Sequence, residues 1–198
     1  MTAPIQAGSS TFSREHSDGS PPRCVFVTGP RGAGKTRWMQ EHIRTLRAKQ
    51  PGMRCGVVLA EEGRTRMERF AQEPPGVAVR RVYLPCPCCP ALANLPGTLY
   101  QLVADARTDW VFLEVPTIAA VALLSEFDRA IGWPRQVVVC QDAAWVDAQR
   151  RHVLSPFFTN LLDLADTVVA GSATPSIPRN ARLPQDVAPG QIQTISLS

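Results

Sequence analysis

The sequence has no long apolar run, no apolar segment near its N-terminus and no basic tract. A membrane-spanning helix needs about 20 consecutive apolar residues, and no run in this chain approaches that length. Because the N-terminus also lacks the apolar core of a secretory signal, we expect a cytoplasmic protein without a membrane partner. The net charge of +4 comes from dispersed arginines, which indicates a solvated surface and does not predict nucleic-acid binding.

Metal-ligand residues outside one cluster are few and isolated. The chain has six cysteines and three histidines. Without an export signal, the cysteines indicate reduced thiols or metal ligands and argue against a disulfide framework. The residues that stand alone, and are expected in the core or on the surface instead of in a metal site, are Cys24, Cys55, Cys140, His16, His42 and His152.

The composition predicts one globular domain. The chain has 198 residues, of which 44% are hydrophobic, and this is enough to bury a full core. Residues 1–22 are rich in Ser, Thr, Gly and Pro and are expected to form a disordered leader. Residues 23–198 are then the domain itself.

Short apolar runs alternate with helical patterns along this domain, which predicts an α/β fold with a mostly parallel sheet and helices on both faces. The predicted strands are 24–28, 55–60, 77–84, 110–113, 136–140, 167–170 and 192–197. The predicted helices are 38–50, 64–73, 92–103 (or a later start at Pro96-Gly97), 116–127 and 146–165, the last interrupted near Ser155-Pro156.

A glycine-rich segment between the first strand and the first helix matches the P-loop pattern G-x-x-x-x-G-K-[ST]. Glycines allow successive backbone N–H groups to curl around a phosphate, and the helix N-terminus adds a partial positive charge. Lys35 is expected to reach the β- and γ-phosphates, and the Thr36 hydroxyl to bind Mg²⁺. The predicted nucleotide-binding residues of the loop are Gly29, Pro30, Arg31, Gly32, Ala33, Gly34, Lys35 and Thr36.

Acidic residues follow two of the predicted strands. Glu114 closes an otherwise apolar strand, at the place where an acid contacts Mg²⁺ in P-loop proteins. The alternative is a solvated acid stabilised by the dipole of the following helix. Glu61 and Glu62 follow another predicted strand in the same way, but the sequence supports a role in the nucleotide site less strongly for them than for Glu114. The sequence therefore predicts Glu114 as a Mg²⁺ ligand or catalytic acid, with Glu61 as a second nucleotide-site residue.

Three thiols lie within four residues in Cys86-Pro87-Cys88-Cys89. Thiolates bind Zn²⁺, Cu(I) and similar metals, and flanking prolines favour the bend that would bring the sulfurs together. Since the sequence has no second pair of cysteines or histidines, such a site would have an open coordination position or a ligand from another molecule. An incomplete site of this kind suits an ion that is transferred to another protein. A redox cluster and an apolar turn are the alternatives.

Together these segments resemble the CobW/HypB/UreG group of P-loop GTPases, most closely its CobW-like branch. The N-E-x-G, C-x-C-C and E-[ST]-x-G segments of that branch are similar to residues 60–63, 86–89 and 114–117, and its D-A and A-D pairs match residues 142–143 and 165–166. Two segments differ from the family pattern. Residues 171–174 stand where the family has the N-K-x-D motif that recognises guanine, and Thr117 stands where the family has a glycine in a switch segment. The chain also ends before the C-terminal domain of larger CobW-like members could begin.

The resemblance implies a metallochaperone or metal-insertion factor that hydrolyses GTP, or ATP, with low turnover. Lys35 and Glu114 would be catalytic, Thr36 and Glu114 would hold Mg²⁺, and Cys86, Cys88 and Cys89 would carry Zn²⁺ or a similar transition metal for a metalloprotein client. A homodimer would form if two chains complete one ion site. A non-hydrolysing nucleotide-binding scaffold and a small-molecule P-loop kinase remain the alternatives.

Overall fold

The computed structural model describes residues 20–60, 67–72, 75–82, 94–151 and 154–170. In this part of the chain, parallel strands form one six-stranded sheet in the order β3-β2-β4-β1-β5-β6. This confirms the predicted α/β fold. The strands are β1 Arg23–Thr28, β2 Cys55–Leu59, β3 Val77–Arg81, β4 Trp110–Glu114, β5 Arg135–Gln141 and β6 Thr167–Ala170.

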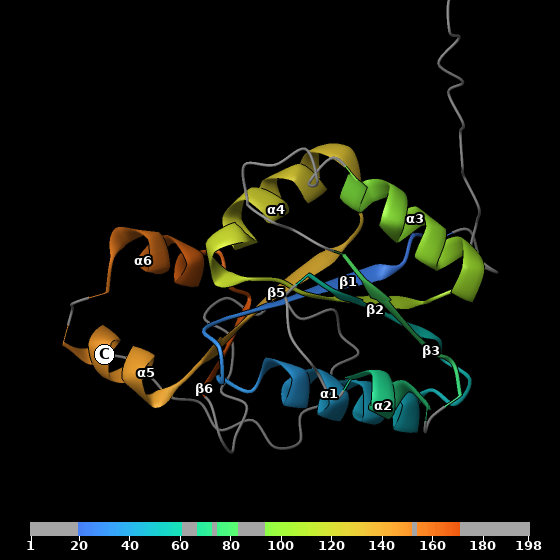
Figure 1. Cartoon of the computed structure of the whole chain (residues 1–198), viewed down its shortest axis with the longest axis horizontal. Coiled ribbons are helices and arrows are strands. Elements are labelled where there is room, and N and C mark those ends of the chain that lie inside the picture. The colour runs from blue at the N-terminus through green and yellow to red at the C-terminus, as the bar shows by residue number, and fades with distance from the viewer. Residues whose placement is uncertain (1–19, 61–66, 73–74, 83–93, 152–153, 171–198) are drawn as a thin grey trace, which may run out of the picture.

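Helices cover both faces of the sheet (Figure 1). Helices α1 (Lys35–Lys49) and α2 (Met67–Gln72) pack on one face, and α3 (Leu95–Ala106) and α4 (Thr117–Ala130) pack on the other. Helices α5 (Ala143–Arg150) and α6 (Pro156–Asp163) connect β5 to β6. None of the helices in the described ranges combines the length and the apolar character that crossing a bilayer requires.

Strand β1 shows why the central strands are apolar on both faces. Val25 and Val27 belong to the core under α1, whereas Cys24 and Phe26 belong to the core under α3 and α4. A strand with helices on both sides has no solvated face, so its sequence is a continuous apolar run instead of an alternating one.

The three isolated cysteines are free and buried, as the sequence predicts. Burial disfavours a thiolate, and it raises the pKa of Cys55 and of Cys140 to about 12 and raises the pKa of Cys24 further. These thiols are therefore core groups, not reactive ones.

Helix boundaries differ from the sequence-based expectation at several ends. Helix α3 starts at Leu95, in agreement with the later of its two predicted starts. Pro116 was expected to open the next helix but precedes it, with an extended backbone (φ −59°, ψ 139°). The last helical region is two helices with a break before Pro156, as predicted. It begins earlier than expected, because the Asp142 side chain accepts a hydrogen bond from Trp145 N and caps α5.

His42 fastens α1 to the sheet through aromatic contacts. Its ring stacks on Trp38 with 4.6 Å between ring centroids and meets Trp110 and Phe112 edge-on. Burial lowers the pKa of His42 to about 4, and the positive charge of Lys49 acts in the same direction. His42 is thus neutral in the folded protein at neutral pH.

We expect His42 to make the fold acid-sensitive. An unfolded histidine titrates near pH 6.5, so stability is fully present above that pH and is lost as the pH falls toward 4. From the pKa shift, the wild type should lose about 2 kcal/mol more than His42→Phe between pH 7 and 4.5, measured by urea unfolding. Carboxylates titrate in both proteins and cancel in this difference. If the two proteins lost the same stability over this pH range, folding would not lower the pKa of His42.

Candidate functional site

The glycine loop joins the end of β1 to the start of α1. Gly29, Gly32 and Gly34 have φ angles of 134°, 88° and 87°, which side chains rarely adopt. At Gly29 the constraint is also steric, since a Cβ there would lie 1.9 Å from the carbonyl oxygen of Cys140 on β5. Helix α1 has no side-chain cap at Gly34 and no acidic residue in its first turn. Its first N–H groups are therefore oriented to receive an anion.

Lys35 is held inside this loop. The residue is only 4% exposed, and Nζ donates hydrogen bonds to the carbonyl oxygens of Gly29 (2.8 Å) and Pro30 (3.2 Å). These two carbonyls position the ammonium at the loop backbone. A buried ammonium beside a ring of backbone N–H groups attracts a phosphate.

Thr36 and Glu114 meet next to the loop although 78 residues separate them in the sequence. The Thr36 hydroxyl donates to Glu114 Oε2 at 3.1 Å, with Oε1 at 3.4 Å. Strands β1 and β4 are neighbours in register, and Val27 pairs with Glu114, so the carboxylate arrives at the sheet edge where the loop begins. Both predicted Mg²⁺ ligands therefore lie together.

The chemistry of these donors fits Mg²⁺. Hydroxyl and carboxylate oxygens are the hard ligands that this ion takes from proteins, usually together with water and phosphate oxygens. Glu114 is 3% exposed, and a buried carboxylate is costly without compensating partners. Burial is the main reason why the pKa of the Cys140 thiol is raised, but the charge of Lys35 lowers this pKa and the charge of Glu114 raises it. Both charged groups therefore lie near Cys140 on β5.

Several predicted site residues lie outside the described residues. These are Glu61 and Glu62, the cluster Cys86, Cys88 and Cys89, the motif at 171–174 and the predicted strand 192–197. Among the residues that the structure does describe, no group of three or more histidine, cysteine, aspartate or glutamate residues could hold a metal ion. The zinc site thus remains a prediction.

The two aspartates that matched family motifs have structural contacts. Asp142 caps α5, and Asp166 accepts a hydrogen bond from Val137 N at 2.7 Å, which ties the start of β6 to β5. Gln141 was overlooked in the sequence. It is buried at the carboxyl end of β5, and its side-chain amide donates a hydrogen bond to Gln149 at 3.1 Å. The sequence pattern that pointed to Glu114, a polar residue at the end of an apolar strand, would also have pointed to Gln141.

The loop, the buried lysine and the Thr36–Glu114 pair agree with a comparison against known families. The model of the CobW/HypB/UreG nucleotide-binding domain matches residues 23–172. The chain belongs to this family. The resemblance seen in the sequence is confirmed, and the chain contains a CobW/HypB/UreG nucleotide-binding domain of the P-loop NTPase class.

Solved structures of FtsY share the fold of this CobW/HypB/UreG domain at low identity. The signal recognition particle receptor FtsY from Elizabethkingia anophelis is 15% identical with a TM-score of 0.54, over 76% of this chain and 50% of that one. FtsY from Thermotoga maritima is 14% identical with a TM-score of 0.54, over 81% and 56%. The hydrogenase maturation factor HypB from Archaeoglobus fulgidus is 16% identical with a TM-score of 0.49, over 75% and 65%. The chain spans about half the length of the FtsY structures it matches. No curated protein matches it significantly.

Proposed function

We propose that this protein is a P-loop NTPase that binds a nucleoside triphosphate with Mg²⁺ and delivers a transition metal to a client metalloprotein. Nucleotide binding is supported mainly by the hydrogen bond between Thr36 and Glu114. It lies beside the glycine loop, where Lys35 Nζ donates to the carbonyl oxygen of Gly29. Membership in the CobW/HypB/UreG family supports it. The metal part rests on the cysteine cluster and on the position of the segment that carries it.

Residues of the loop would bind the phosphates. The backbone N–H groups of residues 29–36 and the Lys35 ammonium would pair with phosphate oxygens, while Thr36 and Glu114 would hold Mg²⁺. The ion would neutralise charge on the phosphates. Glu114, and Glu61 from the neighbouring strand end, would orient the attacking water, and the buried surroundings of Glu114 would limit access of other water.

The three thiols would carry Zn²⁺ or a similar ion as cargo. They follow β3, which runs parallel to β2, so the chain leaves β3 at the same sheet edge as the glycine loop. Strands β2 and β4 lie between β3 and β1. At about 4.8 Å per strand, the ends of β3 and β1 are about 14 Å apart, a span that loops can bridge.

We expect GTP to be preferred to ATP by less than roughly a hundredfold. The family reads guanine with an aspartate, and Gly171, Ser172, Ala173 and Thr174 provide no acid at the corresponding place. A backbone group of the residues that follow in the sequence would then supply the remaining hydrogen bond to the base.

Coupling between metal and nucleotide is the decisive prediction for delivery. Metal affinity, measured by competition with a chromophoric chelator, should differ at least about fivefold between the empty, diphosphate and non-hydrolysable triphosphate states, which is roughly 1 kcal/mol. By linkage, the metal must change nucleotide affinity by the same factor. Replacing Cys86, Cys88 and Cys89 by serine should remove the ion and keep triphosphate binding.

The outcomes separate the candidate functions. Equal metal affinity in all nucleotide states would reject delivery and favour a scaffold that keeps its nucleotide. Phosphate transfer to an acceptor other than water would indicate a kinase. One bound ion per two chains, with a dimeric mass in solution, would show that a homodimer completes the site.

A further inference from the structure

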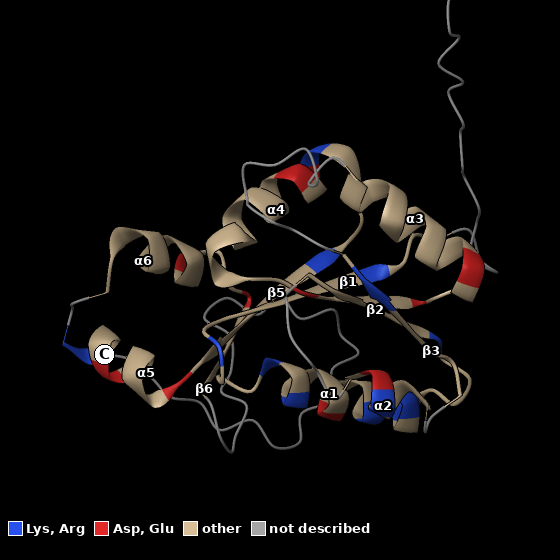
Figure 2. Cartoon of the chain, in the orientation of Figure 1, with Lys and Arg blue, Asp and Glu red and all other residues tan. Residues whose placement is uncertain are grey.

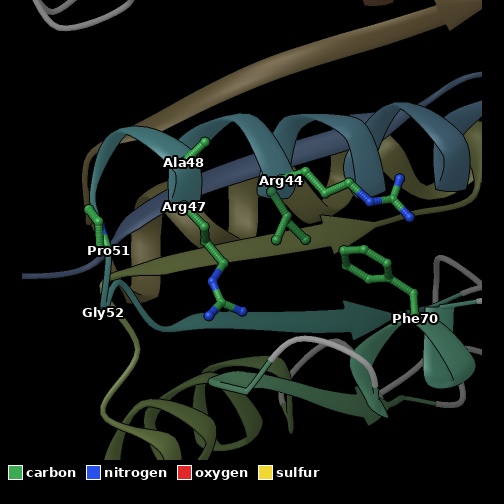
Figure 3. A pocket seen from close by; sticks show the side chains of 7 residues that line it. Arg44, Arg47, Ala48, Pro51, Gly52 and Phe70 are labelled. Atoms are coloured by element: carbon green, nitrogen blue, oxygen red, sulfur yellow. The ribbon is translucent and has the colours of Figure 1, made fainter.

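A pocket of about 420 Å³ lies between α1 and α2, away from the glycine loop. Its walls are the second half of α1, the turn at Pro51-Gly52 and Phe70 of α2 (Figure 3). At about 1.5 Å per residue, Arg47 lies about 18 Å along α1 from Lys35. The pocket is therefore separate from the nucleotide site, although the same helix contributes to both.

Two arginines of α1 line this pocket. The Arg44 guanidinium lies over the Phe70 ring, 4.7 Å from its centroid, which positions it by a cation–π contact. Nη1 of Arg47 is buried, and no hydrogen-bond acceptor reaches it anywhere in the structure described. Since a guanidinium stays charged and a buried unpaired donor is unfavourable, an acceptor brought to Arg47 would offset this cost.

The surroundings favour an anion with an apolar body. Figure 2 shows both basic and acidic residues on α1 and α2, where the two helices lie side by side. The acidic ones, Glu41 and Glu68, pair with Arg37 and Arg81. Of the residues known to line the pocket, none is acidic, and the remaining side chains, such as Ile43, Pro51 and Phe70, are apolar. The volume falls within the range of small-molecule sites.

We propose that this pocket binds a small organic anion whose carboxylate or phosphate group pairs with Arg47. The planar guanidinium offers two parallel donors to such an oxyanion, and Arg44 adds a second positive charge. The apolar body of the ligand lies against Phe70 and Ile43. This site is independent of the proposed nucleotide chemistry.

The test uses benzoate and phenyl phosphate as probes, titrated by calorimetry into the full chain. The titrations use the Lys35→Ala protein, in which any phosphate binding at the loop should be weakened, and the effect of replacing Arg47 in that protein reports the pocket even if the nucleotide proposal fails. In that background, Arg47→Met should weaken both probes at least about tenfold, and Arg44→Met should weaken them less. Arg37→Met is the matched control on the same helix, because Arg37 pairs with Glu41 on the surface, and affinity there should be unchanged.

A structural role for Arg47 predicts different results. In the proposal, Arg47→Met removes an unpaired buried donor, so the melting temperature without ligand should equal or exceed that of Arg37→Met. A lower melting temperature together with unchanged probe binding would overturn the site. The proposal also fails if neither probe binds, or if inorganic phosphate binds as tightly as phenyl phosphate, since the apolar wall would then contribute nothing.

Discussion

Lys35→Ala is expected to lower triphosphate affinity by about 10- to 150-fold while the protein stays folded. Lys35 is buried in the loop and its Nζ is held by the carbonyl oxygens of Gly29 and Pro30. A charge-assisted hydrogen bond of this kind contributes about 1.5–3 kcal/mol, which corresponds to that loss of affinity. Calorimetric titration with GTP and with ATP measures the effect and, at the same time, the preference for guanine.

The control for this variant is the chain's other lysine. Lys49 lies in the last turn of α1, so Lys49→Ala removes the same charge from the same helix, far from the loop. Its triphosphate affinity should equal that of the wild type. Circular dichroism and thermal unfolding establish that both variants fold. A folded Lys35→Ala protein with wild-type affinity would rule out phosphate binding by the loop.

Local patterns were sufficient to predict most of the fold. Each central strand is buried on both faces, so it appears as a continuous apolar run, and the glycine loop has its own signature. The boundaries that were wrong depend on single hydrogen bonds or backbone angles. Asp142 begins α5 early by capping it, and Pro116 remains extended before α4.

The arrangement of the site could be predicted only in part. Parallel strands imply that Thr36 and Glu114 lie at one sheet edge, but their hydrogen bond requires β4 to be the neighbour of β1. Sequence order does not provide this, because β2 and β3 come before β4 along the chain and lie beyond it in the sheet. The close approach of Gly29 to Cys140 likewise depends on β5 lying on the other side of β1.

Glu114→Gln should separate the two interpretations of this residue. Glutamine keeps the shape and can still accept the Thr36 hydrogen bond, but it removes the negative charge. If Glu114 holds Mg²⁺ and orients water, the rate of hydrolysis at saturating GTP should fall about 10²- to 10⁴-fold, and more Mg²⁺ should be needed for binding. The protein should stay folded, because glutamine preserves the hydrogen bond from Thr36.

The measurement is single-turnover hydrolysis of GTP over a Mg²⁺ titration, with Glu41→Gln as the matched control. Glu41 lies on the exposed side of α1, where it pairs with Arg37, so its replacement should leave both rate and Mg²⁺ dependence unchanged. A Glu114→Gln protein that hydrolyses GTP at the wild-type rate would show that Glu114 only fastens α1 to β4 through Thr36. Because glutamine keeps the Thr36 hydrogen bond, that structural role predicts an unchanged unfolding midpoint as well. The rate of hydrolysis and its Mg²⁺ dependence therefore decide between a residue that acts on the nucleotide and one that only joins two elements.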